Sequence, residues 1–71
     1  MKLPRDVSGA DTARALKRFG FVVTRQVGSH MRMVKGSVRI TVPNHKTILP
    51  KTLHTILRQA GLSMEDFVNN L

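Results

Sequence analysis

Residues 21–42, FVVTRQVGSHMRMVKGSVRITV, decide the fold, because three short segments of strand-forming residues follow one another with turn residues between them. β-Branched and alternating apolar residues predict strands over residues 21–26, 30–34 and 38–42. Gly28 and Ser29 form one candidate turn, and Lys35, Gly36 and Ser37 form the other. Connections this short join antiparallel neighbours, so we predict a three-stranded antiparallel meander.

Helical patterns flank these strands. Apolar spacing predicts three helices, over residues 9–18, 51–60 and 63–71. Ser8 with Asp11 three positions later is a capping pair for the first helix, and Gly20 and Gly61 stand where helix terminators belong. The order α-β-β-β-α-α predicts an α+β fold, a three-stranded antiparallel sheet with its helices on one face, in a single domain over residues 1–71.

Alternation along the strands predicts which side chains face the helices. The inward set is Met31, Met33, Val38, Ile40 and Val42. The outward set is His30, Arg32, Val34, Arg39 and Thr41. A shift of one residue in register would exchange the two faces.

Charge is the strongest compositional signal. The 71 residues carry twelve Lys and Arg against four acids, a formal charge of +8, and no acid lies between Asp11 and Glu65. Such a domain attracts polyanions, and the alternative to a binding surface is a basic surface that only contacts solvent.

The sequence has no cysteine, no apolar run near the roughly 18 residues of a membrane span, and no apolar core of a signal peptide. We therefore expect a cytoplasmic protein that binds no membrane.

Catalysis on nucleic acid would have to do without metal. The four acids, Asp6, Asp11, Glu65 and Asp66, lie near the chain ends and mostly resemble helix caps, so we expect no acidic cluster that would hold two metal ions for phosphodiester hydrolysis. His30, His45 and His54 are too widely spaced for a typical metal site, and we expect no metal, cofactor or small-molecule ligand. RNA carries its own nucleophile, the 2′-hydroxyl, so a histidine for proton transfer and arginines for charge would suffice.

Other functions stay open on the residues alone. A histidine on a strand is more often a surface residue than a catalyst, and Gly28 can be simply the hinge of a tight hairpin. The last two helices are compatible with a helix-turn-helix, so the alternative is a non-catalytic module that binds RNA by the sheet or DNA by those helices. A basic domain that binds an acidic protein would leave the placement of His30 unexplained.

Three motifs carry a family resemblance. FVVTRQVGSH at residues 21–30, ITVPNH at residues 40–45 and LHTILRQAGLSMEDF at residues 53–67 occur in that order. From about Ser8 to Leu71 the chain resembles the HicA family, the toxins of HicA–HicB toxin–antitoxin modules. The resemblance implies a fold like a double-stranded-RNA-binding domain, ribosome-independent cleavage of single-stranded mRNA that arrests translation, and neutralisation by a HicB-like antitoxin.

The resemblance also assigns a candidate site. The histidine of the Gly-Ser-His element is the catalytic residue of that family, which carries over to His30 alone. Together with the charge and strand patterns it leads us to expect RNA contacts from Arg25, Gly28, Ser29, Arg32, Arg39 and Lys46. His45 matches a recurring family histidine, either a structural loop residue or an RNA contact. Lys51 stands where the family commonly has glycine and His54 where it has Arg or Lys, departures that leave the Gly-Ser-His element untouched.

Overall fold

The computed structural model describes residues 7–71, and Asp6 lies outside the described residues. The elements are α1 (Gly9–Arg18), β1 (Val22–Val27), β2 (His30–Lys35), β3 (Val38–Pro43), α2 (Pro50–Ala60) and α3 (Met64–Val68). The predicted α+β fold and its order are confirmed. The last helix is shorter than predicted, because after Asn69 the backbone bonds change from the helical four-residue spacing to a three-residue spacing: the Asn70 N–H donates to the Phe67 carbonyl at 3.0 Å and the Leu71 N–H to the Val68 carbonyl at 3.3 Å.

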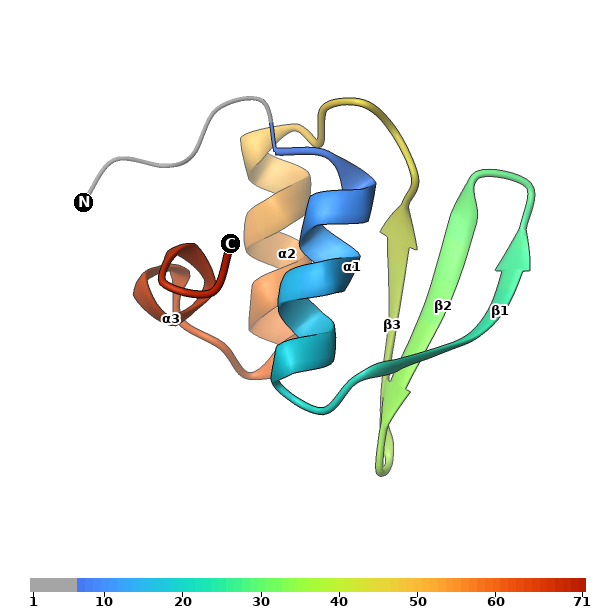
Figure 1. Ribbon diagram of the computed structural model, residues 1–71, viewed down its shortest axis with the longest axis horizontal. Coiled ribbons are helices and arrows are strands. Elements are labelled where there is room, and N and C mark those ends of the chain that lie inside the picture. Colours follow the sequence, from blue (N-terminus) through green and yellow to red (C-terminus); the bar gives the residue numbers. More distant parts are fainter. Residues whose placement is uncertain (1–6) are drawn as a thin grey trace.

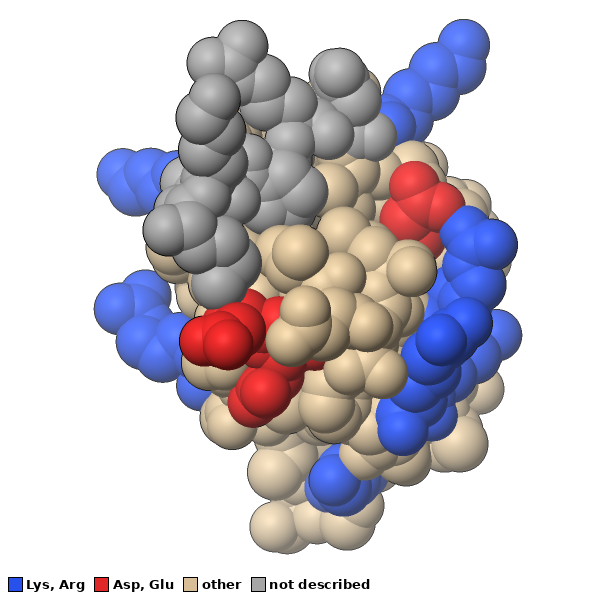
Figure 2. Space-filling model, turned by 60° about the vertical axis from the view of Figure 1, so that its left-hand side comes forward, with Lys and Arg blue, Asp and Glu red and all other residues tan. Residues whose placement is uncertain are grey.

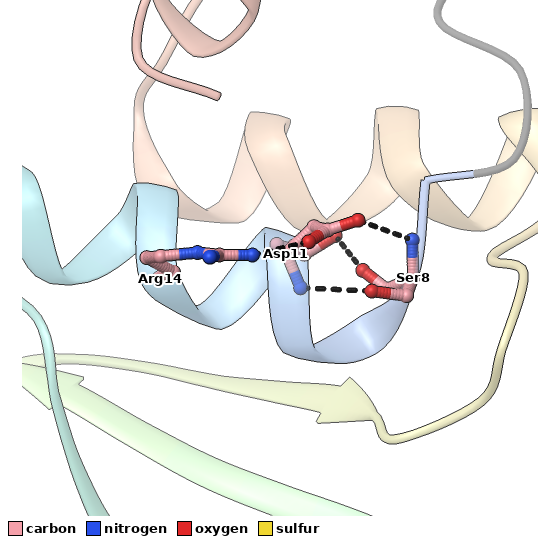
Figure 3. A network of polar contacts seen from close by, with 4 residues as sticks. Ser8, Asp11 and Arg14 are labelled. Atoms are coloured by element: carbon pink, nitrogen blue, oxygen red, sulfur yellow. Dashed lines mark hydrogen bonds and ion pairs between the residues drawn. The ribbon is translucent and has the colours of Figure 1, made fainter.

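Helix α1 begins at a capping box. Ser8 Oγ accepts a hydrogen bond from the Asp11 backbone N–H at 2.9 Å, and the Ser8 N–H donates to Asp11 Oδ2 at 3.4 Å (Figure 3). Asp11 also forms an ion pair with Arg14. The hydrogen bonds from Ser8, helped by the charge of Arg14, hold the pKa of the Asp11 carboxyl below its ordinary value of 3.8.

Helix α2 starts one residue earlier than predicted, at Pro50. Proline suits the first turn of a helix, where its missing N–H would have had no partner within the helix. At the other end Gly61 has a left-handed φ of 75°, which closes the helix with a bond from the Leu62 N–H to the Leu57 carbonyl at 2.9 Å.

The sheet is an antiparallel meander in the order β1-β2-β3 (Figure 1). In β2 and β3, Met31 lies opposite Val42 and Met33 opposite Ile40. The pairing of β1 with β2 contains an irregularity at Thr24, so that Val23 faces Met33 but Arg25 faces Arg32. Because of this bulge, side chains before and after Thr24 do not follow simple alternation.

The core lies between the sheet and the two long helices. Fully buried residues come from the three helices, from β2 and β3, and from the residue before β1, and they include Leu16, Phe21, Met33, Val42, Leu53 and Phe67. In Figure 1 the helices stand together on one side, with β3 nearest to them and β1 farthest away. Every side chain of β1 is accordingly exposed.

Val38 corrects one part of the predicted inward set. It shares the parity of the buried Ile40 and Val42, but 37% of it is exposed. The reason is its position at the turn between β2 and β3, which projects past the ends of the helices (Figure 1). No helix therefore covers this end of the inner face.

Candidate nucleic-acid interface

The predicted strand parity is confirmed for β2. Met31 and Met33 are buried, whereas His30 and Arg32 are exposed on the other side of the sheet. Residues directly opposite each other in antiparallel strands share a face. The register therefore builds one surface, the outer face, from three rows of side chains: Val27, His30 and Pro43; Arg25, Arg32 and Thr41; and Val22, Val34 and Arg39.

The middle row of the outer face carries two like charges. Arg25 lies opposite Arg32, an arrangement that destabilises a bare sheet. Within residues 7–71 the only ion pair joins Asp11 and Arg14 of α1, so no carboxylate neutralises the outer-face arginines there. The positive charge of the outer face is thus not balanced by any carboxylate in the described part of the chain.

The acidic side chains lie elsewhere. Asp11 belongs to α1, and Glu65 and Asp66 belong to the first turn of α3. In Figure 2 the Asp and Glu side chains in view form separate red patches among uncharged residues, and Lys and Arg side chains lie along the left and right edges. The charge of the molecule is therefore unevenly distributed, and the sheet carries only basic side chains among its charged ones.

His30 is held at the point where three segments meet. It is the first residue of β2 and follows a turn in which Gly28 has a φ of 59°, a conformation that favours glycine. The Ser29 carbonyl accepts a hydrogen bond from the Asn44 N–H at 2.5 Å, and the His45 carbonyl accepts one from the Gly9 N–H at 2.8 Å. These bonds connect the turn before His30 to the segment after β3, and that segment to the start of α1.

Gly9 is required for this close approach. A Cβ atom at Gly9 would lie 2.1 Å from the Pro43 carbonyl oxygen and 2.7 Å from the Asn44 Cα. Both atoms belong to backbone, which cannot rotate away as a side chain can. The start of α1 therefore fixes the segment that forms the rim beside His30.

The remaining predicted residues are placed as follows. Gly28 and Ser29 are exposed in the turn next to His30, and Lys46 is exposed in the loop after β3. The structure thus brings Arg25, Arg32, Arg39 and His30 onto one face, while Lys46 lies outside the sheet. His45 is exposed in the same loop as Lys46, and His54 is exposed on α2.

A groove, apart from His30, is lined by α2 and by strand residues of both the inner and the outer face. Its volume is about 740 Å³, and its walls come from the strands, the turn after β2, and α2. The lining side chains are Thr24, Arg32, Met33, Val34, Gly36, Arg39, Ile40, Thr41, Thr52, Thr55, Ile56 and Gln59. The α2 wall was not predicted from the sequence, although Thr52, Thr55 and Gln59 follow the three- and four-residue spacing of one helix face.

Metal-ligating side chains do not gather in the described part of the chain. Over residues 7–71, no three side chains of His, Cys, Asp or Glu come together in a way that could hold a metal ion. None of the helices in this described range is both long enough and apolar enough to span a bilayer.

Fold and site together define a class: a small basic α+β domain whose sheet presents arginines and one histidine on one face. Comparison with protein families goes further. Residues 9–62 match the family described as HicA toxin of bacterial toxin-antitoxin systems, and the chain belongs to this family. It is therefore the toxin of a toxin–antitoxin module. No curated protein matches the chain closely enough to count as a relative.

Proposed function

We propose that this toxin is a metal-independent endoribonuclease that cleaves single-stranded mRNA without the ribosome and so arrests translation. The observation that carries the proposal is the outer face, where exposed His30 shares one surface with Arg25, Arg32 and Arg39 and no described carboxylate neutralises them. Family membership supports the same conclusion, since the protein is a HicA toxin.

The reaction needs only groups present on this face and on the substrate. His30 accepts the proton of a ribose 2′-hydroxyl, whose oxygen attacks the adjacent phosphorus. The bond from phosphorus to the 5′ oxygen breaks, the 5′ oxygen takes a proton from solvent, and the products end in a 2′,3′-cyclic phosphate and a 5′-hydroxyl. Arg32, on the same face two residues along β2, stabilises the negative charge that develops on the phosphoryl oxygens.

RNA binding draws on a wider set of residues. Arg25 and Arg39 contact flanking phosphates from the neighbouring strands, and Lys46 extends the basic path beyond the sheet. Gly28 and Ser29 let the backbone come close to a phosphate, because a Cβ at Gly28 would meet nothing within 4 Å and the turn is open.

The same outer face also suggests how an antitoxin would inhibit the toxin. We propose that a HicB-like antitoxin in the cytoplasm covers the outer face and His30 with acidic side chains. Such a partner would remove the repulsion between Arg25 and Arg32 and exclude RNA at the same time.

The alternative is a non-catalytic nucleic-acid-binding module. Reading of DNA by α2 and α3 is disfavoured, because α3 has only five residues and carries Glu65 and Asp66 in its first turn, where they would repel phosphates. Binding of RNA by the outer face without chemistry is an outcome that the following experiment distinguishes.

The test uses a single-stranded RNA, the same RNA with one 2′-deoxy nucleotide at a mapped cut site, and the DNA counterpart, all in excess chelator. We expect cleavage of the RNA, loss of the cut at the deoxy position alone, and intact DNA. Cleavage that persists at the deoxy position would contradict the use of the 2′-hydroxyl. Binding of the RNA with no cleavage would establish the non-catalytic module.

A further inference from the structure

The groove lined by the strands and α2 combines two kinds of surface. Met33, Ile40 and Ile56 are among its lining residues, so the groove has apolar side chains at its base, although these are almost completely buried within the core. The side chains of Thr52, Thr55 and Gln59 on α2 offer hydroxyl and amide groups along one wall. A groove with apolar side chains at its base and polar groups along one wall suits a planar ring with hydrogen-bonding edges.

The groove and the candidate catalytic face have residues in common, and one of them is Arg32. This residue lines the groove and stands on the outer face two residues along β2 from His30. Same-face neighbours on a strand are separated by about 7 Å. A strand of RNA whose phosphate lies between His30 and Arg32 would therefore have its next nucleotide at the entrance of the groove.

The charge of the lining also fits RNA. Arg32 and Arg39 are its only charged members, and no carboxylate lines it. A volume of about 740 Å³ lies within the roughly 300–1,000 Å³ of small-ligand sites, so one nucleotide can enter. Phosphate oxygens would remain at the arginines while the base lies against the apolar side chains.

We propose that this groove binds the base next to the cut phosphate, and that Thr55 and Gln59 determine which bases are accepted there. The inference rests on the proposed ribonuclease function and adds a specificity site to it. The Thr55 hydroxyl donates to the Lys51 carbonyl at 3.1 Å, so its oxygen lone pairs are directed outward as acceptors. Gln59, exposed one turn later, supplies both an amide donor and a carbonyl acceptor.

The experiment compares the double variant Thr55→Val/Gln59→Ala with the matched control Asn69→Ala, which removes an exposed amide from the end of α3, outside the groove. Binding is measured in a His30→Ala background, which keeps the RNA intact, with short single-stranded RNAs that differ at one base. Cut sites are mapped separately on a mixed-sequence RNA with His30 present. Circular dichroism checks that each variant is folded.

We expect the double variant to reduce the ratio between the highest and lowest affinities for the four bases by about fivefold or more. Its cut sites should also follow a broader range of sequences, while the control keeps the wild-type base preference. Unchanged base preference in a folded double variant would overturn the groove proposal and leave the ribonuclease proposal intact. If the wild-type protein binds RNA but never cleaves it, the ribonuclease proposal fails, and the binding series still decides whether the groove reads a base.

Discussion

At the scale of single residues, the most informative feature is the pairing of Arg25 with Arg32. Like charges directly opposite each other cost a sheet stability, and nothing in the described chain offsets them. Arg39 lies opposite Val34 and has no such conflict. A repulsive pair on an open face is best accounted for by a partner that carries negative charge.

This repulsion predicts opposite effects of one substitution. Arg25→Thr should raise the free energy of unfolding of the free protein by about 0.2–1 kcal/mol and weaken RNA binding. Arg39→Thr is the matched control, with weaker RNA binding but no gain from relieved repulsion. Urea denaturation of the two variants measures the difference, and equal stability changes in both would show that the pair is not repulsive.

The sequence predicts the face of the sheet on which a side chain lies where the strands alternate regularly, and it does not where a bulge interrupts the alternation. His30, Arg32 and Arg39 were correctly placed on one face from strand parity, because β2 and β3 pair without irregularity. Arg25 reaches the same row as Arg32 only because of the bulge at Thr24, and its sequence gives no sign of a bulge. The α2 wall of the groove depends on how helix and sheet meet in space, which local patterns do not encode.

At the scale of elements, the start of α1 has two roles. It is capped by Ser8 and Asp11, and it supports the segment after β3 through the bond from Gly9 to the His45 carbonyl. The cap was predictable, since capping boxes are local in sequence. The close approach of Gly9 was not, because it depends on a segment more than thirty residues away.

The close approach predicts that Gly9→Ala is destabilising. Alanine normally favours a helix interior over glycine, but here its Cβ would overlap the Pro43 carbonyl oxygen. We expect a decrease of about 1–3 kcal/mol in unfolding free energy, as for an overpacked site. Gly36→Asn is the control, since that turn is open and asparagine tolerates its positive φ. A variant at Gly9 as stable as the wild type would refute the close approach.

The capping box predicts a pH-dependent effect of Asp11→Asn. The folded-state pKa of Asp11 is depressed, so the charged form adds stability that is present above the ordinary value of 3.8 and is lost as pH falls through the folded-state pKa. The variant should be less stable than the wild type at pH 7, and the gap should shrink toward pH 2. Thermal melts across this range measure it, and a gap that stays constant with pH would count against the charged cap.

At the scale of the whole molecule, the most distinctive feature is the large excess of basic over acidic residues. Ten basic residues lie between Asp11 and Glu65 with no acid among them, and the fold gathers several on the sheet. Composition therefore predicts a negatively charged partner. It does not predict where that partner binds, because basic residues also lie on α1 and α2.

The salt dependence of RNA affinity in arginine variants shows which surface the RNA contacts. Removing one arginine that binds a phosphate should reduce the slope of log affinity against log salt by about 0.7 for a single strand. We expect this reduction for Arg32→Ala and for Arg39→Ala, and none for Arg18→Ala, an exposed residue in the last turn of α1. A reduced slope in the α1 variant alone would move the RNA from the outer face to the helices.

The most direct test of the central claim is the rate of RNA cleavage by His30→Ala beside His45→Ala and the wild type, with chelator present. His30 is exposed at the start of β2, so the variant should fold normally and still bind RNA. We predict that its cleavage rate falls at least about 100-fold, the contribution of a general base, while His45→Ala retains substantial activity. Cleavage at the wild-type rate by His30→Ala would contradict the account.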